Sequence, residues 1–219
     1  MDTNEHTTAQ KTSEKPKFAE EVKEFYQGEL KDIFLTFFRN PINGILNIFQ
    51  KPSEKAYKNS LILFASTFVL YFAGSYFLAG EVRKYIEFST FIKIGLIPIA
   101  MMLLISIIAF IIKSISGNPD FKNELQTGGL CAIPISLLLF MAFAINFFSN
   151  TDIMSLVSNL ASAGTITLLF VLYILLMLIN VFQQSLKASS TEDAIAWYLA
   201  PASVLLAAYL TYEVSKMLF

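Results

Sequence analysis

The stretch Ser60–Gly80, SLILFASTFVLYFAGSYFLAG, decides the fold class of this protein because it contains no charged residue. It lies between Lys58 and Glu81, and its 21 residues are enough for one helix to cross a hydrocarbon core of about 30 Å at about 1.5 Å of rise per residue. We therefore predict that it is a transmembrane helix.

Further apolar stretches follow it along the chain. The uncharged run 153–186 is too long for one perpendicular helix, and its milder first part, 154–159, is predicted to be a loop or an interfacial segment. The predicted spans are about 60–80, 89–112, 126–148, 160–183 and 194–212. The predicted fold class is an all-α integral membrane protein with five transmembrane helices preceded by cytoplasmic amphipathic helices.

The composition agrees with this fold class and excludes several functions. Hydrophobic residues make up 55% of the 219-residue chain and charged residues 15%, against about 45–50% and about 25% in soluble domains. The single cysteine, Cys131, excludes a disulfide scaffold and a Cys-based zinc site. The net charge of −1 gives no basic footprint for nucleic acid.

The N-terminal region divides into two parts. Residues 1–16 are polar and are predicted to be a disordered tail, in which His6 is solvated and no signal peptide is present. Residues 17–52 are predicted to form amphipathic interfacial helices, and residues 53–219 the membrane domain. Nine Lys and Arg precede the first span, and with the loops after the second and fourth spans this side has twelve, against four on the other side. The positive-inside rule therefore predicts a cytoplasmic N-terminus and an outside C-terminus.

Apolar residues recur at spacings of three and four from Phe18 onward, which indicates an amphipathic helix that Gly28 could divide into two pieces. Asn40–Pro41 predicts a break and a fresh helix start. The candidate interfacial or partner surface consists of Phe34, Phe37, Phe38, Ile42, Ile45 and Phe49. Two placements are open: this surface lies in the headgroup region, which we favour, or it binds a partner or folds back over the ends of the spans.

The spans carry few groups that could do chemistry. No Asp, Glu or His lies in the apolar core of any predicted span, and no nucleotide-binding motif is present, so we predict no catalytic residue, no metal site, no cofactor and no enzyme activity. Uncharged polar residues in the spans can hydrogen-bond between helices, which we favour, or line a path for an ion or a substrate. They are Ser66, Thr67, Ser136, Asn146, Thr165, Thr167, Asn180, Gln183 and Gln184.

Prolines lie inside three of the predicted spans, at Pro98, Pro134 and Pro201. Each removes a backbone hydrogen bond and can kink its helix. Membrane helices tolerate proline, but three kinks could also shape a shared cavity. The alternative function is therefore a small transporter or channel component with a path lined by these helices.

Two stretches resemble one family. Phe38–Ile45, FRNPINGI, leads into the first span, and Phe121–Pro134, FKNELQTGGLCAIP, opens the third. With the five-span layout they resemble the Yip-domain membrane proteins, named for interaction with Ypt and Rab GTPases. The chain lacks the Asp-Leu-Tyr-Gly-Pro signature of eukaryotic members, so the resemblance implies a bacterial-type member, located in a bacterial cytoplasmic membrane. It implies a non-enzymatic protein that acts in membrane organisation or as an adaptor, with the lipid bilayer and other membrane proteins or its own copies as partners.

Overall fold

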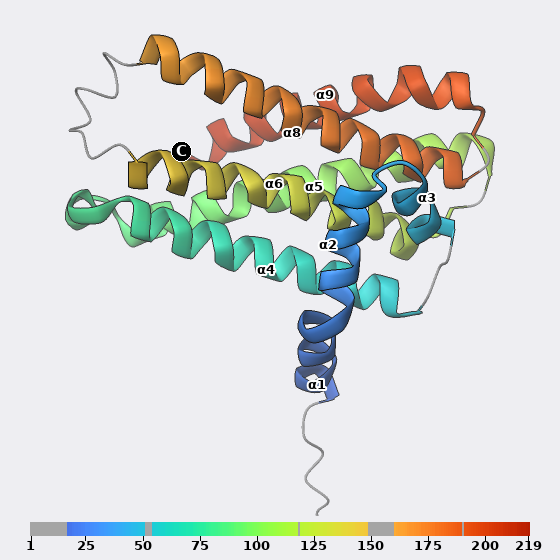
Figure 1. The fold of residues 1–219 in the computed structure, drawn as a ribbon, viewed down its shortest axis with the longest axis horizontal. Helices are drawn as coiled ribbons and strands as arrows, with labels where there is room; N and C mark the ends of the chain where they lie inside the picture. The colour runs from blue at the N-terminus through green and yellow to red at the C-terminus, as the bar shows by residue number, and fades with distance from the viewer. Residues whose placement is uncertain (1–16, 51–53, 118, 149–159, 190) are drawn as a thin grey trace, which may run out of the picture.

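The computed structural model describes residues 17–50, 54–117, 119–148, 160–189 and 191–219 (Figure 1). The predicted disordered tail with His6, and the predicted loop at 154–159, lie outside the described residues. Within these ranges the chain forms α1 (Lys17–Glu24), η1 (Phe25–Glu29), α2 (Leu30–Arg39), α3 (Asn43–Gln50), α4 (Glu54–Leu78), η2 (Gly80–Tyr85), α5 (Phe88–Ser116), α6 (Phe121–Phe148), α8 (Leu160–Ala188) and α9 (Asp193–Leu218).

Five of these helices, α4, α5, α6, α8 and α9, are long and apolar enough to cross a membrane, which confirms the predicted fold class. They run alongside one another in a bundle (Figure 1). We call the end at which α4, α6 and α9 begin the proximal end, and the opposite end the distal end. The described helices extend beyond several predicted bounds: α5 continues to Ser116, and α6 begins at Phe121.

Helix α5 is central, because it packs against all four of the other long helices. Adjacent glycines on α6 allow the closest approaches. A Cβ atom on Gly128 would lie 2.3 Å from the carbonyl oxygen of Met102 in α5, and one on Gly129 would lie 2.8 Å from Cβ of Ser60 in α4. Since backbone atoms cannot move aside as a flexible side chain can, these positions hold α4, α5 and α6 together and require glycine.

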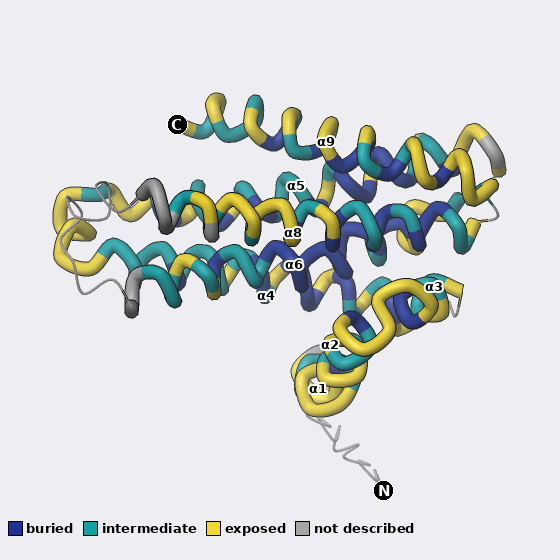
Figure 2. Tube along the Cα trace, turned by 45° about the horizontal axis from the view of Figure 1, so that its top comes forward, coloured by how far each residue is buried: buried dark blue, intermediate teal, exposed yellow. Residues whose placement is uncertain are grey.

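Burial is concentrated in the proximal half of the bundle (Figure 2). On α6 every residue from Glu124 to Ile135 is buried except Gln126, whereas most described residues after Ile135 are not. Large side chains that are almost fully buried in this half include Met102, Ile105, Ile174, Val181, Phe182 and Leu186. The proximal half is therefore the better packed part, and it forms a firm base for the N-terminal helices.

The outer surface of the bundle is apolar. Val69, Leu168, Leu172, Leu176 and Tyr209 are all more than 40% exposed. Soluble monomers rarely expose apolar surface of this extent. A surface of this kind is suited to contact with lipid chains.

Candidate functional site at the proximal end

The N-terminal helices lie across the bundle. Helices α1 and α2 are joined end to end by η1 into one rod, residues 17–39, which we call the crossing rod. Figure 1 shows that it runs across the direction of α4 near the proximal end and that α1 projects beyond the side of the bundle. The sequence predicted that Gly28 could divide this helix, but Gly28 lies within η1 and the rod is continuous.

The π-helical turn η1 aligns the two apolar stripes of the rod. An α-helix turns by about 100° per residue, and a π turn inserts about one extra residue. In an uninterrupted α-helix, Phe25 would point to a different side of the rod from Phe37. The extra residue of the π turn brings both side chains to the side that faces the bundle, where they are 1% and 2% exposed. Single π turns inside helices are rare and often occur at functional sites.

Acidic residues of the rod pair with the first turns of α4. Glu21 forms an ion pair with Lys58, and both Glu24 and Glu29 lie 3.7 Å from Lys55 Nζ. Two hydrogen bonds add to these contacts, from Asn59 to Glu29 and between Tyr26 and Ser66. The ion pairs are exposed and each contributes little, so the buried phenylalanines carry most of the docking energy.

The six residues of the predicted surface differ in their exposure. Phe34, Phe38 and Ile42 are exposed, at 46%, 42% and 57%. Phe37 and Ile45 are buried inside the molecule and Phe49 is partly buried against the core, so these three occupy the fold-back placement and not the favoured interfacial one. The physical reason is that the segment folds back onto the spans with one part of its apolar face while another part stays exposed.

An apolar groove lies on the distal side of the crossing rod. It has a volume of about 710 Å³. The rod contributes Val22, Tyr26, Leu30 and Phe34, and the opposite wall comes from α4 and α6. This side of the rod therefore faces apolar side chains of α4 and α6.

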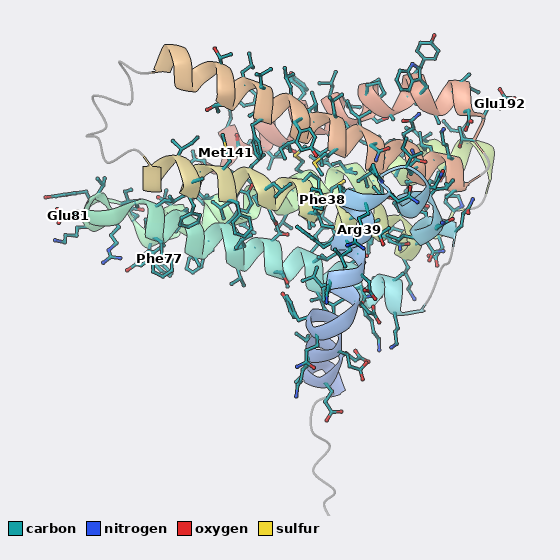
Figure 3. The ribbon with its side chains drawn as sticks, in the orientation of Figure 1. Phe38, Arg39, Phe77, Glu81, Met141 and Glu192 are labelled. Atoms are coloured by element: carbon teal, nitrogen blue, oxygen red, sulfur yellow. The ribbon has the colours of Figure 1, made fainter. Side chains whose placement is uncertain are left out.

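A polar cavity lies on the other side of the rod, where α2, α3, α4 and α6 meet. Its volume is about 700 Å³. Charged side chains at Glu29, Asp32 and Arg39 line it from the crossing rod, and Asn40, Asn47 and Gln126 add amide groups. Arg39 follows Phe38 at the end of α2, as Figure 3 shows. Among the described residues, neither Arg39 nor Asp32 has an ion-pair partner.

The break predicted at Asn40–Pro41 is present. Helix α2 ends at Arg39, and the carbonyl of Asn40 accepts a hydrogen bond from the Gly44 N–H, although α3 itself begins at Asn43 rather than at Pro41. Asn180 of α8 donates to the carbonyl of Pro41 at 2.7 Å. This bond attaches the turn between α2 and α3 to the bundle.

A second polar group lies buried where α5, α6 and α8 meet. Lys113 Nζ lies 2.7 Å from Glu124 Oε2 and donates to Ser185 Oγ at 2.9 Å. Ser185 Oγ in turn lies 2.6 Å from Thr127 Oγ1. The side chains of Lys113 and Glu124 are 8% and 6% exposed. Burial of this pair is possible because each charge has its counter-charge and because Lys113 also donates a hydrogen bond to Ser185.

Lys113 and Glu124 lie just outside the predicted spans 89–112 and 126–148, so the sequence did not single them out as site residues. In the structure α5 extends past Lys113 and α6 starts before Glu124, so both residues lie on long helices. One signal could have revealed the pair: the opposite charges flank a short turn between antiparallel helices, which brings them side by side. Nearby, Gln184 is buried and donates to Asn180, while its Oε1 has no hydrogen-bond partner in the described part of the chain.

The predicted kink positions do not share one environment. Pro98 and Pro134 are buried inside α5 and α6, and Pro201 is partly exposed in α9. None of them lines the polar cavity or the apolar groove. These prolines are therefore separate from the proximal site.

The chain was compared with known proteins and structures. It matches no protein-family model, no curated protein and no solved structure. The likeness to Yip-domain proteins therefore stays a resemblance based on Phe38–Ile45 and Phe121–Pro134.

Proposed function

We propose that this is a non-enzymatic multipass membrane protein that organises the bilayer around its crossing rod. The proximal end lies on the cytoplasmic side in this proposal, and the membrane is a bacterial cytoplasmic membrane. The observation that carries the proposal is the rod itself, which extends sideways from the bundle with Phe34 and Phe38 exposed.

The two sides of the rod support an interfacial position. Val22, Tyr26, Leu30 and Phe34 face the apolar groove on the distal side, while Asp32 and Arg39 face the polar cavity on the proximal side. An amphipathic helix parallel to the membrane buries its apolar face about 5–10 Å into the headgroup and acyl boundary. The rod lies across the spans in the direction that this requires.

A rod in one leaflet acts as a wedge. It occupies area among the headgroups of that leaflet and little area in the opposite leaflet. Membrane binding by interfacial amphipathic helices is sensitive to the curvature of the membrane. The bundle fixes the rod in place through Phe25 and Phe37. The resemblance to Yip-domain proteins agrees with such a role, with the bilayer as the first partner and other membrane proteins or a second copy as further ones.

Curvature sorting tests the proposal. The protein is reconstituted into vesicles of mixed diameter, vesicles with the N-terminus outside are captured by an N-terminal tag, and protein density is measured against diameter. We expect enrichment on small vesicles and its loss in Phe34→Ser/Phe38→Ser. The matched control is Phe77→Ser, at an exposed phenylalanine near the distal end of α4 (Figure 3), which keeps the enrichment. Equal density of the wild type at all diameters contradicts the proposal.

One observation favours the alternative of a small transporter or channel component. Ionisable residues inside a span often mark ion or proton paths, and Lys113 and Glu124 are such residues. A proton or solute flux in sealed vesicles that disappears in Glu124→Gln, together with unchanged curvature sorting, would support this function instead.

A further inference from the structure

We infer that the polar cavity between α2, α3, α4 and α6 binds the headgroup of a phospholipid with a primary ammonium, that is, a phosphoethanolamine headgroup. The inference rests on the proposed position of the proximal end at the membrane surface. It goes beyond the wedge because it assigns a specific lipid to a specific cavity.

The cavity presents separate sites for an anion and a cation. Arg39 lies at the C-terminal end of α2, and Asp32 lies seven residues earlier on the same helix, a separation of about 10 Å along the helix axis. Both side chains lack an ion-pair partner within the described ranges. A guanidinium binds phosphate oxygens through two parallel hydrogen bonds, and a carboxylate accepts from an ammonium.

The length of the headgroup fits this arrangement. In phosphoethanolamine two methylene carbons join the phosphate to the ammonium, so the charges are closer together than the backbone positions of Arg39 and Asp32. Side chains on a helix lean toward its N-terminus, which brings the long Arg39 side chain toward Asp32. Glu29, one turn before Asp32, also lines the cavity but is engaged by Lys55 and Asn59, so Asp32 is the carboxylate that meets the ammonium.

The lining distinguishes between the common headgroups. Quaternary ammonium ligands such as choline are typically bound in cages of aromatic rings, and the described residues that line this cavity include no aromatic side chain. A glycerol headgroup carries no cation for Asp32. The volume of about 700 Å³ lies within the usual range of small-ligand sites, about 300–1,000 Å³.

The position of the cavity gives the acyl chains a route to the bilayer. Phe34 and Phe38 lie on the exposed side of the same helix, with ring centroids 4.7 Å apart. Phe38 directly precedes Arg39 (Figure 3). Lipid chains can therefore pass over this aromatic pair while the headgroup stays in the cavity.

Native mass spectrometry of the full chain in detergent tests the inference. The probes are dihexanoyl phosphatidylethanolamine, phosphatidylcholine and phosphatidylglycerol, each titrated separately. We expect wild-type protein to bind the ethanolamine lipid about fivefold more tightly than either of the others, from one charge-assisted contact at a partly exposed site.

Three variants separate the contacts. Arg39→Gln should weaken binding of all three lipids, because it removes the phosphate contact. Asp32→Asn should abolish the preference for ethanolamine and leave glycerol-lipid binding unchanged. Lys31→Gln, at an exposed charge on α2 outside the lining, should change nothing. Equal wild-type binding of the three lipids, or the same loss in Lys31→Gln as in Arg39→Gln, overturns the inference. Because no bilayer is present, this result is independent of curvature sorting.

Discussion

Removal of one partner of the buried Lys113–Glu124 pair should destabilise the bundle strongly. Lys113→Met leaves the Glu124 carboxylate buried at 6% side-chain exposure without its counter-charge. Breaking a buried pair in this way typically costs about 3–5 kcal/mol. For a chain of this length 1 kcal/mol shifts the midpoint of thermal unfolding by about 2–4 °C, so we expect a decrease of roughly 6–20 °C.

Thermal unfolding in detergent, followed by far-ultraviolet circular dichroism, measures this shift. The matched control is Lys55→Met, which removes a lysine whose side chain is 66% exposed and whose ion pairs are long, and it should change stability by no more than about 1 kcal/mol. The double variant Lys113→Met/Glu124→Leu removes both charges and should recover most of the lost stability, because apolar replacement of a buried pair is often neutral. A decrease no larger than that of Lys55→Met, or a double variant as unstable as Lys113→Met, would refute the reasoning.

Three further predictions concern packing and docking. Gly128→Ala should disrupt the contact of α5 with α6, because its Cβ would lie 2.3 Å from a backbone oxygen. The control Gly164→Ala, where an added Cβ meets nothing within 4 Å, should leave the stability unchanged or raise it by up to about 1 kcal/mol through helix propensity. The midpoints of thermal unfolding of the two variants measure the difference. Phe37→Ser should make the crossing rod sensitive to protease in detergent, because Phe37 is 2% exposed and holds the rod on the bundle. Phe34→Ser/Phe38→Ser should make it sensitive only in vesicles. Equal protection of both variants in both media would contradict this. Charge reversal at Lys58→Glu should increase protease cleavage of the crossing rod in detergent, because it places a second carboxylate beside Glu21. Glu21→Lys in the same chain should restore protection, and no restoration is expected if the Glu21 contact has no role in docking.

The long helices could be predicted because a bilayer imposes a length and an absence of charge. Ser60–Gly80 meets both conditions by itself, and α4 contains most of it. The same rule, that a span lacks charge, explains why Lys113 and Glu124 were missed. A charged residue at the end of an apolar run is taken as the start of a loop. Hydropathy counts each charge separately, whereas burial depends on the partner, and the partner of Lys113 lies on the next helix.

The crossing rod could be predicted only in part. Its apolar periodicity indicated an amphipathic helix, but lipid and protein interior are both apolar, so the pattern could not tell Phe37 from Phe38. The π turn at Phe25–Glu29 also changes which residues share a face, and the sequence gives no indication of it apart from Gly28. The polar cavity depends on the fold, since Arg39 and Gln126 line it together only when the crossing rod lies across the bundle.

The depth of the crossing rod in the bilayer tests the central claim most directly. Spin labels are placed at Phe34→Cys and at Asp32→Cys in a Cys131→Ala background, and their collision rates with oxygen and with a water-soluble nickel complex are measured in vesicles. The two positions lie on opposite sides of α2, toward the groove and the cavity. An interfacial rod gives oxygen-dominated collisions at position 34 and nickel-dominated collisions at position 32. Nickel-dominated collisions at both positions would contradict the account.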